Sequence, residues 1–110
     1  MISEDDIEKS VDYLRDNARK AGQARANRLY LDEYRKVVKA QVMREKDNQP
    51  LGAQERDAYA SVTYGEHLEA LKEAIEKDEY HRWMMIAAQA KIEMWRTQQA
   101  NARAEGRAYT

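Results

Sequence analysis

The apolar positions of residues 3–46 follow the spacing of an amphipathic helix. Apolar or small residues recur at alternating steps of four and three, which is the spacing of a coiled-coil seam. This line consists of Ile7, Val11, Leu14, Ala18 and Ala21. Ser3 and Asp6 before it match the N-cap and the third helical position of a capping box. The pattern predicts a long helix over residues 3–46.

The apolar line changes register near the middle of this predicted helix. The next two seam positions after Ala21 fall on Arg25 and Arg28. The apolar line resumes on a shifted register, through Ala24, Leu31, Tyr34, Val38 and Val42. An arginine in a helix seam costs free energy unless it meets a carboxylate, solvent or a ligand. Arg25 and Arg28 are therefore the residues that helix packing explains least.

The second half of the chain begins after a single strong helix breaker. Pro50 and Gly52 stand among turn-forming residues and predict a hairpin loop over residues 47–52. A short helix is expected over residues 53–60. Thr63 and Glu66 form a second capping-box pattern, which predicts a kink near 61–63 and a long helix over 63–100. We expect the polar tail, residues 101–110, to be frayed.

The second long helix is most apolar between residues 83 and 95, and its apolar face is wider than one partner helix can cover. We therefore expect subunits to associate through the large side chains of this stretch, Trp83, Met84, Met85, Ile86 and Trp95. The predicted fold class is all-α. A single domain of 110 residues would form an elongated antiparallel helical hairpin and assemble into a dimeric or larger helical bundle.

Charge alternates in sign along the chain. Residues 15–46 hold ten Lys or Arg and four Asp or Glu, whereas residues 47–80 hold three and nine. A hairpin folded at Pro50 would place the basic block opposite the acidic block. Because the net charge is −1, nucleic-acid binding would need a local basic patch. We predict phosphate contacts with single-stranded DNA from a candidate patch of Arg25, Arg28, Arg35 and Lys39. Tyrosines near this patch could stack on bases.

Other chemistry finds little support in the sequence. The chain has no cysteine, and its four glycines are isolated from one another, so it has no phosphate-binding glycine loop. Asp78 and His81 have the spacing of half a carboxylate–histidine metal motif, without a second half. We expect no metal, no cofactor and no enzymatic activity. The acidic N-terminus has no apolar run behind it, so we expect a cytoplasmic protein that is not bound to a membrane.

Several segments resemble a group of small helical phage and prophage proteins. These are residues 2–7, 11–18, 34–36, 55–60 and 91–96, and the resemblance covers nearly the whole chain. It implies a phage origin, the cytoplasm of a host cell, and an accessory part in phage DNA recombination or replication. Binding to single-stranded DNA or to a phage or host DNA-processing protein would serve that part. The alternative is a structural or adaptor protein whose only ligands are other proteins, including a host enzyme that it inhibits.

Overall fold

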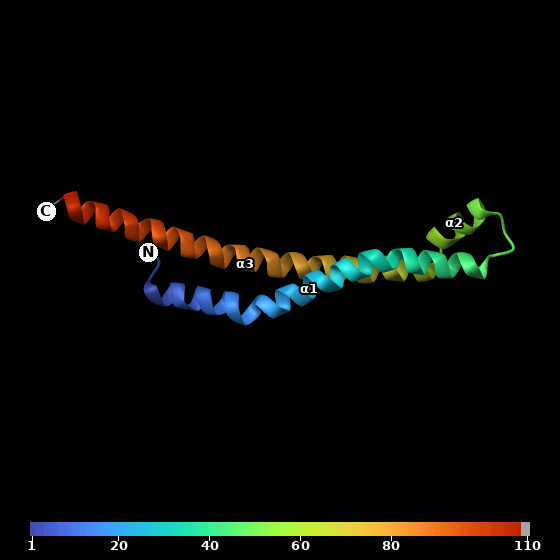
Figure 1. The fold of residues 1–110 in the computed structure, drawn as a ribbon, viewed down its shortest axis with the longest axis horizontal. Coiled ribbons are helices and arrows are strands. Elements are labelled where there is room, and N and C mark those ends of the chain that lie inside the picture. Colours follow the sequence, from blue (N-terminus) through green and yellow to red (C-terminus); the bar gives the residue numbers. More distant parts are fainter. Residues whose placement is uncertain (109–110) are drawn as a thin grey trace. The chain divides into compact units, whose positions relative to one another are not determined.

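The computed structural model describes residues 1–108, and all of its regular structure is helical. Figure 1 shows two long helices, α1 (Glu4–Glu45) and α3 (Val62–Ala108), and the short α2 (Leu51–Tyr59), which connects them in the sequence. No strand occurs in this part of the chain. The predicted all-α fold with two long helices is confirmed, whereas assembly into a dimer or larger bundle stays a prediction.

Helix α1 begins with the capping box that the sequence predicts. The backbone N–H of Asp6 donates to Ser3 Oγ over 3.1 Å, and the backbone N–H of Ser3 donates to Asp6 Oδ2 over 3.0 Å. Each side chain thus satisfies a backbone donor at the helix end. The hydrogen bond from the Ser3 backbone, followed by the one with its hydroxyl, holds the pKa of Asp6 below its ordinary value.

The break between α2 and α3 lies at residues 60–61, and Ser61 caps α3. Ser61 Oγ accepts the backbone N–H of Tyr64 over 3.1 Å and donates to the carbonyl oxygen of Ala58 over 2.7 Å. The predicted cap at Thr63 is therefore wrong, because Thr63 already lies in the first turn of α3. The Ser61 side chain therefore hydrogen-bonds both the C-terminal end of α2 and the N-terminal end of α3.

The C-terminal segment continues α3 instead of fraying. The helix runs through residues 101–108, and residues 109–110 lie outside the described part of the chain. The prediction of a frayed tail over 101–108 is wrong. Ala102, Ala104 and Glu105 are strong helix formers, and they offset the cost of the single Gly106.

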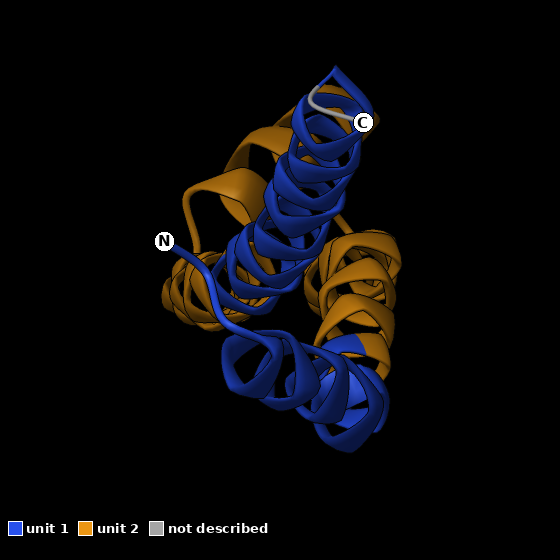
Figure 2. Cartoon of the chain, turned by 90° about the vertical axis from the view of Figure 1, so that its left-hand side faces the viewer, with its two compact units in different colours: residues 1–21, 80–110 blue, residues 22–79 orange. Residues whose placement is uncertain are grey.

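The chain divides into two compact units, where the sequence predicts a single domain. Unit 1 joins residues 1–21 to residues 80–110, and unit 2 comprises residues 22–79 (Figure 2). In each unit a segment of α1 packs against a segment of α3. In unit 2, α2 lies beside the C-terminal end of α1 (Figure 1), and its Ala58 is fully buried.

Buried and half-buried residues of the two long helices recur at steps of three and four, and we call this line the intrachain seam. In unit 2 its α1 side consists of Ala24, Arg28, Leu31, Arg35, Val38 and Val42. Its α3 side consists of Tyr64, His67, Leu71, Ala74 and Asp78. In unit 1 the seam consists of Ile7, Ser10, Leu14, Asn17 and Ala21 on α1, and of His81, Met85, Ala88, Ile92 and Trp95 on α3.

The seam of α1 keeps one period through both units, so the predicted change of register is wrong. Val11 is 46% exposed and Ala18 is also exposed, whereas the polar Ser10 and Asn17 occupy the seam. Both polar side chains are satisfied within the helix. Ser10 Oγ donates to the carbonyl of Asp6 over 3.0 Å, and Asn17 Nδ2 donates to the carbonyl of Tyr13 over 3.0 Å. Their hydrogen bonds remove most of the cost of burial.

Candidate functional site

Arg28, one of the four predicted DNA contacts, forms an ion pair inside the seam of unit 2. Its Nη1 lies 2.8 Å from Asp78 Oδ2 and 3.5 Å from Glu79 Oε1. Asp78 is only 7% exposed. A carboxylate buried to this extent needs a positive partner. Arg28 therefore has a structural task, and its charge is neutralised within the chain.

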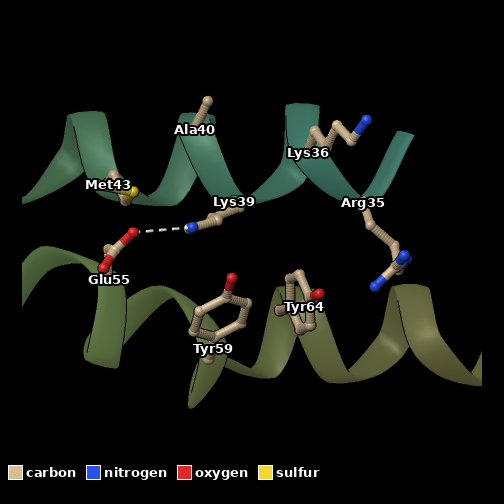
Figure 3. A pocket seen from close by; sticks show the side chains of 8 residues that line it. All are labelled: Arg35, Lys36, Lys39, Ala40, Met43, Glu55, Tyr59 and Tyr64. Atoms are coloured by element: carbon tan, nitrogen blue, oxygen red, sulfur yellow. Dashed lines mark hydrogen bonds and ion pairs between the residues drawn. The ribbon is translucent and has the colours of Figure 1, made fainter. Parts of the chain in front are cut away.

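Arg35 and Lys39 line a groove of about 600 Å³ between α1 on one side and α2 and α3 on the other (Figure 3). Lys39 reaches from α1 to Glu55 on α2, with 3.0 Å between Nζ and Oε1. Its Nζ also lies 4.8 Å from the centre of the Tyr59 ring. Hydrogen bonds with Tyr59 and then with Glu55 raise the pKa of Lys39.

The opposite wall of the groove contains two tyrosines that the sequence analysis did not select. Figure 3 shows the rings of Tyr59 and Tyr64 facing α1, and the two rings meet edge to face with centroids 5.3 Å apart. A hydrogen bond with Tyr64, ahead of the attraction of Asp32, raises the pKa of Arg35. Arg35 also pairs with Asp32 at 2.9 Å. The cations of the groove are thus already held by neighbours in the same chain.

The four predicted DNA contacts do not form one surface. Arg35 and Lys39 share the groove, Arg28 is paired in the seam, and Arg25 is exposed outside both. Unit 2 as a whole contains ten Lys or Arg and twelve Asp or Glu, which gives 10 − 12 = −2. The basic block of α1 therefore does not give this unit a positive balance.

Only part of the acidic block faces the basic block. Asp78 and Glu55 make ion pairs to α1 within unit 2. Four other carboxylates are exposed on the outer side of α3, and none of them forms an ion pair within residues 1–108: Glu66, Glu69, Glu73 and Glu76. The two blocks oppose each other at a few contacts and otherwise point to solvent.

The five predicted interface residues divide between two faces of α3 in unit 1. Met85 and Trp95 belong to the intrachain seam and are half-buried against α1. Trp83, Met84 and Ile86 lie outside the seam, and they are 60%, 38% and 38% exposed. Met84 also lines a shallow pocket with Ser10 and Tyr13 of α1. The wide apolar face that the sequence indicates therefore divides into a part that lies against α1 and a part, around Trp83 and Ile86, that α1 leaves exposed.

A second apolar line runs along the uncovered side of α3, and we call it the outer stripe. It consists of Tyr80, Trp83, Ala87, Ala90 and Met94, again at steps of three and four. Trp83 stands two residues from seam residues His81 and Met85, which is roughly 200° around a helix in either direction. Tyr80 and Met94 are 60% and 57% exposed. The sequence indicates the outer stripe as a second line of apolar residues with helical spacing, offset from the intrachain seam.

The residues at these outer positions change character where unit 1 begins. Glu66, Glu69, Glu73 and Glu76 occupy the same positions of the repeat in unit 2 that the outer stripe occupies in unit 1. Acidic side chains are the ordinary composition of a helix face in water. The apolar side chains from Tyr80 onward are not, so the outer stripe is the surface of this chain that solvation explains least.

Within residues 1–108 no group of three or more His, Cys, Asp or Glu side chains is placed to hold a metal ion. His67 Nε2 lies 2.7 Å from the carbonyl oxygen of Leu31, and Asp78 of the Asp78–His81 pair is engaged by Arg28. None of the helices, over the same residues, has a stretch long and apolar enough to cross a membrane.

Comparison with known proteins adds no relative, because no family model, curated protein or solved structure matches the chain.

Proposed function

We propose that this chain is a non-enzymatic, helical protein-binding module whose contact surface is the outer stripe of α3. The observation that carries this proposal is the exposure of Trp83 and Met94, 60% and 57%, on the side of α3 that α1 leaves uncovered. Apolar patches of this kind mark interaction sites on soluble folds, and Trp and Met are enriched in the cores of protein interfaces.

Contact with a partner would remove the apolar side chains of the outer stripe from water. Burying apolar surface yields roughly 25 cal/mol per Å², and a large aromatic side chain can bury 150–250 Å². The outer stripe stays in contact with water in the isolated chain, whereas a partner helix packed along the stripe would bury it and gain this free energy. A phage or host DNA-processing protein, or a host enzyme that the chain inhibits, would be a partner of this kind.

Photo-crosslinking tests the proposal. The full chain would carry a benzophenone amino acid at Trp83, and the control chain would carry it at Lys72, which is exposed on α3 in unit 2. After irradiation of producing cells, we expect a discrete protein adduct from position 83 and none from position 72. The absence of an adduct at position 83, or equal adducts at both positions, would contradict the proposal.

Single-stranded DNA is the second candidate ligand, and the groove of unit 2 favours it. Lys36 lines this groove beside Arg35 and Lys39, and its ion pair with Glu33 lies at the surface, where its side chain is 76% exposed and can exchange that partner for a phosphate. Tyr59 is 54% exposed. Cations beside an accessible aromatic ring suit a phosphate backbone with stacked bases. Together with the resemblance to phage proteins, this favours a part in phage DNA recombination or replication.

Salt-dependent binding to a labelled oligonucleotide tests the second candidate. Lys36→Glu combined with Arg25→Glu removes exposed cations without touching the Arg28–Asp78 pair. We expect weaker binding and a shallower dependence on salt for this variant, and no change for the control Arg103→Glu, which lies in unit 1. Binding that is equal in the variant and the wild type, or undetectable at low salt, would remove DNA from consideration.

A further inference from the structure

The outer stripe of α3 has a symmetric order of side-chain sizes. Two small residues, Ala87 and Ala90, lie between the large Trp83 and Met94, and the steps between the four are four, three and four residues. Tyr80 and Thr97 follow three residues beyond either end. The stripe therefore reads the same, large–small–small–large, from either direction along the helix.

We infer that the partner of the outer stripe is a second copy of this chain, docked antiparallel along α3 of the first. This rests on the proposed protein-binding function and names its partner. With the twofold axis between Ala87 and Ala90, each Trp83 lies opposite Met94 of the other copy. Each Ala87 lies opposite the other copy's Ala90. A twofold contact needs a self-complementary surface of this kind.

The side chains suit a close contact. Alanines at the centre allow the two helix backbones to approach closely, and the thioether of methionine packs favourably against an aromatic ring. Ile86 flanks the stripe and is 38% exposed, so it widens the surface that the second copy covers. Between residues 80 and 97 the only carboxylate is Glu93, which already pairs with Arg96 at 3.2 Å.

Electrostatics favours the antiparallel orientation over the parallel one. Glu76 precedes Tyr80 by one turn of the same helix and is exposed. In a parallel pair it would face Glu76 of the other copy, whereas in the antiparallel pair its opposite residue is Asn101. The helix dipoles also oppose each other only when the helices are antiparallel. The paired segment, residues 80–97, is about 27 Å long at 1.5 Å per residue, so we expect a modest, micromolar dimer.

Sedimentation equilibrium of the full chain at tens of micromolar tests the self-association. We expect a dimer for the wild type and a dissociation constant at least about 30-fold higher for Trp83→Glu, the loss typical of an interface hot spot. Tyr30→Glu is the matched control, because Tyr30 is an equally exposed aromatic, at 62%, on α1. It should leave the dimer intact. Circular dichroism checks that both variants remain helical.

Disulfide trapping tests the orientation, since the chain contains no cysteine of its own. A mixture of Tyr80→Cys and Thr97→Cys chains should form a disulfide-linked heterodimer. Each variant alone should not, because its two thiols would lie roughly 25 Å apart along the helices. Linkage of each variant to itself but not to the other would overturn the antiparallel pairing.

Sedimentation and photo-crosslinking together separate the identity of the partner from the protein-binding function. A wild-type monomer at tens of micromolar overturns self-association. If the photo-crosslink from position 83 then joins the chain to a different protein, the protein-binding function stands and only the identity of the partner is wrong. A monomer without any crosslink from position 83 overturns both.

Discussion

At the scale of single residues, the intrachain seam contains polar side chains that are hydrogen-bonded or ion-paired within the chain. Ser10 and Asn17 are satisfied by carbonyls one turn earlier in α1, and Arg28 is satisfied by Asp78 on α3. Arg28 and Asp78 fit the seam only as a pair, since each would be costly alone. We interpret this pair as a device that fixes which residues of α1 and α3 face each other in unit 2.

The Arg28–Asp78 pair predicts unequal effects of single and double substitutions. Arg28→Ala should lower the free energy of unfolding by about 3 kcal/mol, the low end of the range for removing one member of a buried pair. The low end applies because the Arg28 side chain remains 32% exposed. Replacing both residues, as Arg28→Met with Asp78→Leu, should restore most of the loss. Urea unfolding measures both.

Arg15→Ala provides the comparison for the Arg28 variants. Its ion pair with Asp12 is at the surface, where both side chains are exposed, so we expect a loss below about 1 kcal/mol. If Arg28→Ala lowered the free energy of unfolding by as little as this, the Arg28–Asp78 pair would not stabilise the fold.

The capping box of α1 predicts a dependence on pH. The hydrogen bonds from Ser3 lower the pKa of Asp6 below its ordinary value of 3.8. The carboxylate therefore stabilises the folded state above that value, and this contribution is lost as the pH falls through the lowered pKa. We expect Asp6→Asn to lower the melting temperature at neutral pH, and its effect to diminish as the pH falls below 3.8. An effect that stays the same across this range would contradict the assignment.

At the scale of elements, the ends of the helices depend on individual side chains. Ser61 accepts the backbone N–H of Tyr64 and closes the end of α2, whereas Thr63 lies inside α3. Ser61→Ala should therefore reduce the free energy of unfolding by about 1 kcal/mol, the usual cost of losing an N-cap. Thr63→Ala should be close to neutral or slightly stabilising. Thermal unfolding of the two variants separates these expectations, and the opposite order would restore Thr63 as the cap.

The elements also show what the sequence could predict. Pro50 locates the turn between α1 and α2, and Ser3 with Asp6 locates the start of α1, because backbone chemistry at these positions is local. The predicted loop over 47–52 extends too far, because Gly52 is already the second residue of α2, which begins at Leu51 instead of at residue 53. The seam could not be read from apolar residues alone. Its polar members Ser10, Asn17 and Arg28 have hydrogen-bond or ion-pair partners, and in the case of Arg28 the partner lies 50 residues away in the sequence.

The candidate site was predictable to a similar degree. The apolar stretch between residues 83 and 95 is evident in the sequence, but its division between two faces depends on where α1 lies. Met85 and Trp95 belong to the covered face, and Trp83 belongs to the uncovered one. Among the four predicted DNA contacts, Arg28 forms an ion pair with Asp78, and Lys39 forms one with Glu55. A count of charges along the sequence does not show which acid meets which cation.

At the scale of the whole molecule, one chain buries little apolar surface. Among the described residues no large side chain is fully buried, and the buried apolar set includes three alanines, Ala24, Ala58 and Ala74. Large apolar side chains such as Trp83 and Met94 remain mostly exposed. A small chain with a thin core gains most from association. The chain would therefore gain most from burying the outer stripe against a partner protein.

Hydroxyl-radical footprinting in producing cells measures whether a partner covers the outer stripe, whichever protein that partner is. Met1 is 97% exposed and serves as the internal reference for Met94, which is 57% exposed in the isolated chain. We predict that Met94 is oxidised far more slowly than its exposure implies, and that Trp83→Glu restores its oxidation. Oxidation of Met94 in proportion to its exposure, unchanged by Trp83→Glu, would show that the outer stripe is uncovered and would contradict the account.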